Sequence, residues 1–382
     1  MTKIAVVCGD VTAALNRRPE LMQRFVECSE TAPLLICPPS EKSHLDDIRA
    51  IGFDVIEVEN NKQSLNPVSG LSYFKEIRKL LQQHSATDVF AFHLLPIVAA
   101  GKACRKLGIR FHGLFAGLGY VFSNESSVKR KLAEFVTVRL LRSSLKNATT
   151  VFFQNPDDCQ TITSKKVFSP NTNVVVVDGS GVSLDRFQYS EPEVDGKVVF
   201  LLVSRILRDK GLPEYYEAAR RLKEKWNDQV QVQLLGPFDQ NPNAMTKEQI
   251  NEWHEQGIVE YLGVTEDVRP YLSAMSVFTL PSFYMEGTPK TILESLASGR
   301  AIITTNSRGC RETVVDGENG FMIEPKDVDG LFQSMDYFLE NRQAIKTMGM
   351  ASRELAESKY DVRLVNQHML DCMGLETKGS AS

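Results

Sequence analysis

The sequence lacks any apolar run long enough to cross a membrane, and it lacks an excess of basic residues. A membrane-spanning helix needs roughly 18 or more consecutive apolar residues, and no stretch of the 382 residues reaches that length. The formal net charge is -4, whereas nucleic-acid-binding proteins usually carry a marked basic excess. We therefore expect neither a membrane span nor a nucleic-acid partner.

Closely spaced cysteines are also absent. The seven cysteines are scattered, and no two of them form a Cys-x-x-Cys pair. This spacing argues against a disulfide framework and against a zinc site. The beginning of the chain has a short apolar run with Lys3 as its only early basic residue, which is typical of a first strand rather than of a signal peptide. A cytoplasmic protein with reduced thiols is expected.

Short apolar segments recur along the chain between amphipathic helical patterns such as 212–226. They form one series at 3–7, 33–37, 53–58, 88–92, 149–153 and 173–177, and a second at 198–204, 230–236, 258–263, 276–281 and 301–305. Nearly all are continuous rather than alternating, as in strands that are buried on both faces of a parallel sheet. The sequence therefore predicts an α/β protein with two doubly wound, Rossmann-like domains that face a central cleft.

A polar stretch without periodicity, residues 183–197, separates the two series. We place an N-terminal domain at 1–185 and a C-terminal domain at 198–360. The last helix, at about 361–373, is expected to pack back onto the first domain, and 374–382 to form a flexible tail.

The segment FYMEGTPKTILESLASGRAII, residues 283–303, places two carboxylates around a helix start. Thr288 is predicted to be the N-cap and Pro289 the first helical residue. Unpaired N–H groups at a helix N-terminus can hold an anion. Glu286 and Glu294 on either side of it would suit a ligand with phosphate in the middle and a hydroxylated ring at each end. The alternative is a solvated helix with ordinary surface glutamates.

The longer run EGTPKTILESLASGRAIITTNSRGCRETVVDGENGF (286–321) closely resembles the donor-site signature of the retaining family 4 glycosyltransferases, which have the GT-B fold. That signature is a glutamate, seven residues, a second glutamate, and then small-residue, glycine and strand elements. The segments GCRETVVDGENG (309–320) and GLGYVF (117–122) are most similar to the bacterial branch that builds polyprenyl-diphosphate-linked glycans and surface polysaccharides. The resemblance is strong over about 198–325 and weaker before it.

The resemblance implies roles for residues of the C-terminal half. Arg205 and Lys210 match the basic pair that binds the donor diphosphate, Glu286 the residue that holds the donor sugar, and Glu294 the ribose ligand. Further donor contacts are implied for Gly263 and Val264 beside the base, for Gly287 beside the sugar, and for Thr288, Pro289 and Lys290 at the helix start. One of the two cations could instead pair with Asp209 or Glu214 on the surface.

In the N-terminal half the resemblance implies acceptor contacts, and here the match is partial. Gly9 stands where family members have a glycine-rich turn, and His93 ends a predicted strand at a position that is often histidine. The family's usual active-site imidazole falls at Ala116 in this sequence, four residues after His112. We expect His112 to be a packed or surface histidine, whereas a catalytic and a structural role for His93 stay equally open.

The activity that the resemblance implies is transfer of a sugar with retention, without a metal or another cofactor. The donor would be UDP-GalNAc, UDP-GlcNAc or UDP-Gal, and the acceptor a lipid-linked or polysaccharide-precursor glycan. The leaving diphosphate would help to deprotonate the acceptor hydroxyl. Two alternatives remain: an epimerase of similar architecture, and a catalytically silent protein that binds nucleotide sugars.

Residues 127–148 carry six basic side chains against one acidic side chain, Glu134, together with apolar residues that include Leu132, Phe135, Val136 and Leu141. A basic amphipathic helix in an otherwise acidic protein favours docking on an anionic membrane. The protein would then be peripheral on the cytoplasmic face. The alternative is a core helix with a charged outer face.

Overall fold

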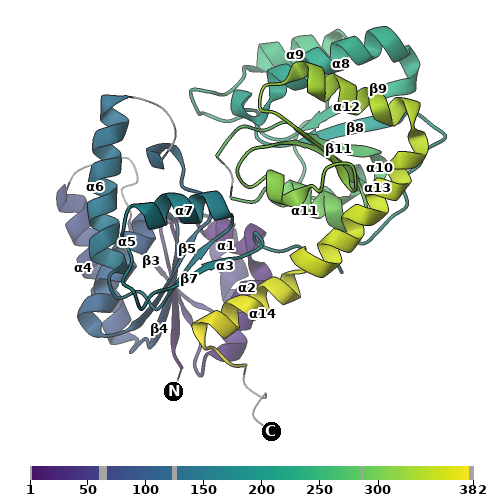
Figure 1. The fold of residues 1–382 in the computed structure, drawn as a ribbon. Coiled ribbons are helices and arrows are strands. Elements are labelled where there is room, and N and C mark those ends of the chain that lie inside the picture. Colours follow the sequence, from purple (N-terminus) through teal and green to yellow (C-terminus); the bar gives the residue numbers. More distant parts are fainter. Residues whose placement is uncertain (1, 60–66, 123–126, 286, 378–382) are drawn as a thin grey trace. The chain divides into compact units, whose positions relative to one another are not determined.

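The computed structural model describes residues 2–59, 67–122, 127–285 and 287–377. The chain divides into two compact units: Met1–Ser180 together with Arg363–Ser382, and Gly181–Val362. Each unit contains one parallel sheet with helices on both faces (Figure 1).

The first unit is built around a seven-stranded sheet with the order β3-β2-β1-β4-β5-β6-β7, in which every neighbouring pair is parallel. Its elements are β1 (Ile4–Val7), α1 (Val11–Arg17), α2 (Pro19–Cys28), β2 (Leu34–Cys37), α3 (Lys42–Ile51), β3 (Asp54–Glu57), α4 (Pro67–Gln83), β4 (Asp88–Phe92), α5 (Leu94–Leu107), β5 (Arg110–Phe115), a 3-10 turn η1 (Tyr120–Phe122), α6 (Val128–Leu145), β6 (Thr150–Phe153), α7 (Pro156–Ser164), β7 (Asn173–Val176) and α14 (Val362–Met373).

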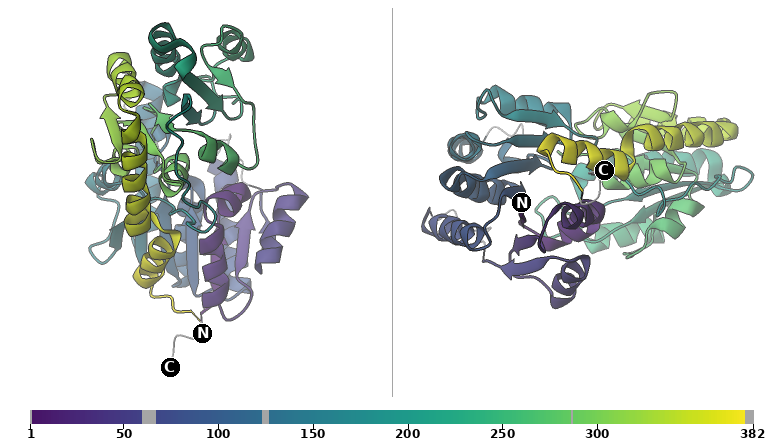
Figure 2. Two further views of the ribbon diagram at one scale, coloured as in Figure 1. Left: turned by 90° about the vertical axis from the view of Figure 1, so that its right-hand side faces the viewer. Right: turned by 90° about the horizontal axis from the view of Figure 1, so that it is seen from below.

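Burial along the strands of the first sheet follows their position in it. Strands β1, β2, β4 and β6 are buried along their whole length. In the edge strands β3 and β7, the first and last residues are exposed and the two between them are partly buried. Helices α4–α7 cover one face, and α1–α3 with α14 cover the other (Figures 1 and 2). The continuous apolar segments therefore form strands that are buried on both sides, as predicted.

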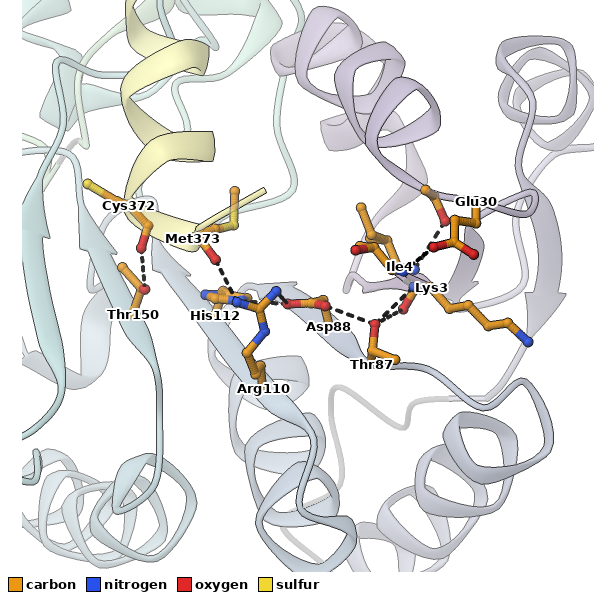
Figure 3. A network of polar contacts seen from close by, with 12 residues as sticks. Lys3, Ile4, Glu30, Thr87, Asp88, Arg110, His112, Thr150, Cys372 and Met373 are labelled. Atoms are coloured by element: carbon orange, nitrogen blue, oxygen red, sulfur yellow. Dashed lines mark hydrogen bonds and ion pairs between the residues drawn. The ribbon is translucent and has the colours of Figure 1, made fainter. Parts of the chain in front are cut away.

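The end of α14 is fixed to the amino-terminal edge of the first sheet (Figure 3). Arg110 donates to the Met373 carbonyl at 3.2 Å and pairs with Asp88 at 2.6 Å, and Thr150 donates to the Cys372 carbonyl at 3.0 Å. His112 is buried there, with Nε2 3.4 Å from the Asp88 carboxylate. Burial lowers the pKa of His112, so the ring is neutral and donates to Asp88. His112 is a packed histidine, as expected.

The second unit contains a six-stranded parallel sheet with the order β10-β9-β8-β11-β12-β13. Its elements are β8 (Val198–Val203), η2 (Arg208–Lys210), α8 (Leu212–Trp226), η3 (Asn227–Gln229), β9 (Val230–Leu235), α9 (Lys247–Glu255), β10 (Glu260–Tyr261), α10 (Arg269–Ala274), β11 (Val277–Leu280), α11 (Lys290–Ala297), β12 (Ala301–Thr305), η4 (Arg311–Thr313), β13 (Gly320–Ile323), α12 (Val328–Glu340), α13 (Arg342–Leu355) and a π-helical turn η5 (Ala356–Tyr360). Helices α8 and α12 pack together on one face, and α11 and α13 on the other (Figure 1).

The polar stretch 183–197, predicted as the break between domains, belongs to the second unit. Three arginines of that unit donate to its carbonyl groups: Arg300 to Ser190, Arg342 to Val194 and Arg353 to Phe187. These bonds satisfy a backbone that no sheet or helix pairs, and they fix it to the unit. The chain changes unit at 180–181 and again at 362–363.

Candidate functional site

The predicted donor residues that the structure describes lie at the carboxyl edge of the second sheet. Arg205 follows β8, Gly263 follows β10, and the loop before α11 follows β11. Strands β8 and β11 are neighbours, and the chain leaves them in opposite directions across the sheet. Such a switch point leaves a crevice outside the strand ends, where open α/β sheets bind ligands.

Arg205 and Lys210 meet at this switch point around the ring of Tyr284. The Arg205 guanidinium carbon lies 5.6 Å from the ring centroid, and the Lys210 Nζ lies 5.1 Å from it. Lys210 is only 7% exposed. Both contacts are within cation–π range, so the ring holds the two cations near each other.

Arg205 also pairs with a carboxylate that the sequence does not point to. Its Nη1 lies 2.6 Å from Oδ2 of Asp239, which follows β9. Burial lowers the pKa of Arg205, but hydrogen bonds with Asp239 and Tyr284 outweigh that effect and raise it overall. Asp209, considered above as a partner, instead accepts a hydrogen bond from the Asn243 side chain at 2.9 Å.

The start of α11 differs by one residue from the prediction. Pro289 is the N-cap, with φ -63° and ψ 117°, and Lys290 is the first helical residue. The assignment of Thr288 as N-cap is therefore wrong, because Pro289 keeps an extended ψ and its carbonyl accepts the first helical bonds, from Ile292 and Leu293. Pro289 has no side chain that could cap this end, and a helix N-terminus of this kind suits an anion.

Glu294 lies in the second turn of α11 and is half-buried. Burial raises the pKa of its carboxyl to about 7, although Lys290 and Arg186 act in the opposite direction. Within the described ranges no group donates a hydrogen bond to this carboxylate. Such an acceptor suits ligand hydroxyls. Its predicted counterpart, Glu286, lies outside the described residues, and Gly287 and Thr288 immediately follow it.

Gly263 and Val264 form an open surface after β10. Gly263 has a φ of +82°, and no heavy atom lies within 4 Å of the position that a Cβ would occupy. Its carbonyl accepts a hydrogen bond from the Gly236 N–H at 2.8 Å. Val264 is 65% exposed. A flat, apolar ring such as a nucleobase could cover it.

Sequence reasoning did not find Asp239 and Tyr284. Both follow the carboxyl ends of strands, β9 and β11, that flank β8. Their position just after a predicted strand could have identified them as candidates, because it places their side chains near Arg205.

In the first unit, Gly9 and His93 occupy the corresponding switch point, between β1 and β4. The Gly9 N–H donates to His93 Nδ1 at 3.2 Å. This bond makes Nδ1 the acceptor, so that Nε2 carries the proton of the neutral ring. His93 has a φ of +72°, a conformation that is costly for a residue other than glycine and that clusters at functional sites.

A cavity of about 60 Å³ lies beside His93 in the same unit. It is lined by Arg17, His93, Leu94, Ile97, Leu114, Phe115, Ala116, Gly117, Leu118 and Phe122. These residues come from the end of α1, the junction of β4 with α5, the end of β5, the loop after β5, and η1. The cavity could take the reacting end of an acceptor. Ala116, which replaces the imidazole expected from the resemblance, is part of its wall.

Helix α6 has apolar residues on two sides. Leu141 and Leu145 are buried in the core, whereas Leu132 and Phe135 are 63% and 58% exposed. Val128 and Val136 are exposed as well. The predicted single apolar side is therefore wrong: one part packs inward, and the other shares the outer face with lysines and arginines. No helix in the described part of the chain is long and apolar enough to cross a membrane.

Residues 185–355 match the family model for glycosyl transferases group 1. A similar protein is the N,N'-diacetylbacillosaminyl-diphospho-undecaprenol alpha-1,3-N-acetylgalactosaminyltransferase of Campylobacter jejuni, which is 29% identical over 88% of this chain and 89% of its own length. The capsular polysaccharide biosynthesis glycosyltransferase CapM of Staphylococcus aureus is 24% identical over 49% of this chain and 50% of its own length.

Among solved structures, Anabaena HepE in complex with UDP and glucose is similar with a TM-score of 0.75 and 17% identity, covering 98% of this chain and all of that one. A glycosyltransferase from Rickettsia africae has a TM-score of 0.77 and 19% identity, covering 97% of each chain. At such identities the likeness concerns the fold. Residues 185–355 thus match a group 1 glycosyltransferase domain, and the two Rossmann-like units of the chain have the fold of solved GT-B glycosyltransferases.

Proposed function

We propose that the protein is a retaining, metal-independent glycosyltransferase. It moves GalNAc, GlcNAc or Gal from a UDP donor to a lipid-linked or polysaccharide-precursor glycan. The observation that carries this proposal is the meeting of Arg205 and Lys210 around Tyr284 at one switch point, where the loop that leads into α11 and Glu294 also begins. The name of the Campylobacter relative, which specifies a diphospho-undecaprenol-linked acceptor and GalNAc transfer, supports the acceptor class.

The donor is proposed to lie along the carboxyl edge of the second sheet. Its diphosphate binds between Arg205, Lys210 and the start of α11, and its ribose hydroxyls bind Glu294. The remaining donor contacts are proposed for Gly263 and Val264 at the base, for Glu286 and Gly287 at the sugar, and for Thr288, Pro289 and Lys290 near the phosphates.

Catalysis in this scheme consists of positioning and of charge stabilisation. The bond between the sugar C1 and the diphosphate oxygen breaks, and a bond from C1 to the acceptor oxygen forms on the same face. The acceptor proton passes to the departing diphosphate. Each close contact between a cation and that diphosphate is worth ~4 kcal/mol at an effective dielectric constant near ~20, before desolvation is subtracted. His93, through its Nε2–H, is proposed to orient the acceptor in the first unit.

The function is tested by UDP release from UDP-GalNAc, UDP-GlcNAc, UDP-Gal and UDP-Glc, with and without a polyprenyl-diphosphate-linked sugar, in the presence of EDTA. We expect acceptor-dependent release from one donor, with an α-linked product by NMR. A β-linked product would rule out retention, and loss of activity in EDTA would rule out the metal-free mechanism. Tight UDP binding without release from any donor would favour a silent binding protein.

Membrane docking by α6 is a further part of the proposal. Its outer face combines Leu132, Phe135 and Val136 with basic residues such as Lys131 and Arg139. An apolar stripe beside cations is the pattern of helices that lie in the interface of an anionic bilayer.

Replacing Leu132 and Phe135 together with serine should weaken binding to anionic vesicles about tenfold or more, because each exposed side chain that enters the interface contributes on the order of 1 kcal/mol. Co-sedimentation with vesicles that contain phosphatidylglycerol measures this. Met350→Ser is the matched control, since Met350 is 52% exposed on α13 of the second unit. Unchanged binding of the double variant would exclude this face as the docking surface.

A further inference from the structure

Two adjacent arginines lie at the end of α1, and the first of them borders the cavity of the first unit. Arg17 is exposed and lines the cavity together with His93. Arg18 is only 3% exposed, and its Nη1 lies 3.8 Å from the sulfur of Met369 on α14. Its Nη2 is buried without a hydrogen-bond partner. Within the described ranges neither arginine forms an ion pair with a carboxylate.

This arrangement leaves positive charge uncompensated at the rim of a concave site. A buried cation is costly unless an anion or several hydrogen bonds accompany it. The described residues that line the cavity include no acidic side chain. An anionic ligand at the rim would therefore be attracted by Arg17, without competition from a carboxylate among those lining residues.

The side of the cavity that Leu118 and Phe122 form lies against helix α6. Leu118 and Phe122 line the cavity, and η1, which contains Phe122, packs against α6. Arg130 of α6 donates to the Val121 carbonyl at 3.0 Å. Helix α6 therefore packs against the turn that supplies one side of the cavity. A ligand with a lipid chain could keep the chain near α6 while its polar head reaches the cavity.

We propose that Arg17 binds the diphosphate of a lipid-linked acceptor, whose sugar hydroxyl enters the cavity beside His93. The inference rests on the proposed function for the identity of the acceptor. The cavity volume, about 60 Å³, corresponds to several water molecules and suits the end of one sugar rather than a lipid chain. The diphosphate would then lie at the rim, where Arg17 is.

Direct binding tests this inference independently of turnover. The probes are one acceptor sugar linked to a short prenyl diphosphate, and the same sugar linked to a neutral alkyl chain. Arg17→Ala should weaken binding of the diphosphate probe about 10- to 100-fold, as expected for loss of a hydrogen bond between charged groups. Binding of the neutral probe and of UDP should not change. In transfer assays the loss should appear in the KM for the acceptor, with kcat and the KM for the donor retained.

Two further variants make the result specific. Arg17→Lys keeps the charge and should restore part of the affinity. Arg105→Ala removes an exposed arginine near the far end of α5 and should have no effect. Equal binding of the diphosphate probe by the wild type and Arg17→Ala, or an equal loss for both probes, would overturn the inference. If the wild type binds the diphosphate probe through Arg17 but transfers no sugar to it, the inference stands and the proposed function fails.

Discussion

Replacing Lys210 with methionine should lower kcat/KM for sugar transfer by about 100- to 1000-fold, the effect of removing one group that stabilises charge developing in a transition state. Lys210 is 7% exposed and lies 5.1 Å from the Tyr284 ring, beside Arg205. In the proposed mechanism, charge accumulates on the donor diphosphate as its bond to the sugar breaks, and the Lys210 ammonium would contribute most when that charge is largest. Methionine keeps the aliphatic part of the side chain, and the packing should survive.

Arg208→Ala is the control for this prediction. Arg208 lies two residues before Lys210, is exposed, and donates to the Gln249 side chain at 3.2 Å. Its loss should change kcat/KM less than about threefold, since removal of an exposed partner costs little. Thermal unfolding should give similar Tm values for both variants and the wild type. A Lys210→Met enzyme with near wild-type kcat/KM would show that Lys210 is a packing residue and would remove it from the mechanism.

The fold could be predicted wherever apolar residues form an unbroken run. Helix α8 (Leu212–Trp226) coincides with the predicted 212–226, and the fully buried strands β1, β2, β4 and β6 were found. Two strands were missed. β5 begins with Arg110 and contains His112, so its composition does not suggest a buried strand. β13 has four residues and starts with Gly320. Both are defined by pairing with neighbours that are distant in the sequence.

The site could be predicted in part, because strand ends and a helix start mark the positions of ligand-binding loops. Arg205 and Lys210 lie together at the switch point that topology favours. Their contacts were not predictable, since Asp239 and Tyr284 approach from different strand ends. The unusual φ of His93 and the burial of Glu294 are also invisible in the sequence. Each depends on how the surrounding elements pack.

The burial of Glu294 predicts that donor binding depends on pH. Burial raises the pKa of its carboxyl to about 7 in the free protein. Ribose hydroxyls would donate to the ionised carboxylate, which lowers its pKa in the complex. Binding therefore releases a proton at pH values between the two pKa values. Affinity for a UDP-sugar should rise by up to about tenfold per pH unit toward pH 7 and level off above it.

Isothermal titration calorimetry with a UDP-sugar from pH 5.5 to 8.5 measures this dependence. Repeating the titration in buffers with different ionisation enthalpies gives the number of protons released on binding. A UDP-sugar is preferred to UDP, because the terminal phosphate of UDP titrates near pH ~6. Glu294→Gln should weaken binding about 10- to 100-fold above pH 7, through loss of hydrogen bonds to a charged acceptor. It should also remove the pH dependence.

A matched control separates this effect from the effect of removing any one negative charge from the unit. Glu318→Gln removes an exposed carboxylate of the same unit and should leave both the affinity and the proton release unchanged. A pH-independent affinity in the wild type, or one that falls as the pH rises toward 7, would contradict the role of Glu294 as a ribose ligand. If Glu294→Gln lost affinity equally at every pH, the residue would act through the packing of α11, because only the ionised carboxylate couples ribose binding to a proton.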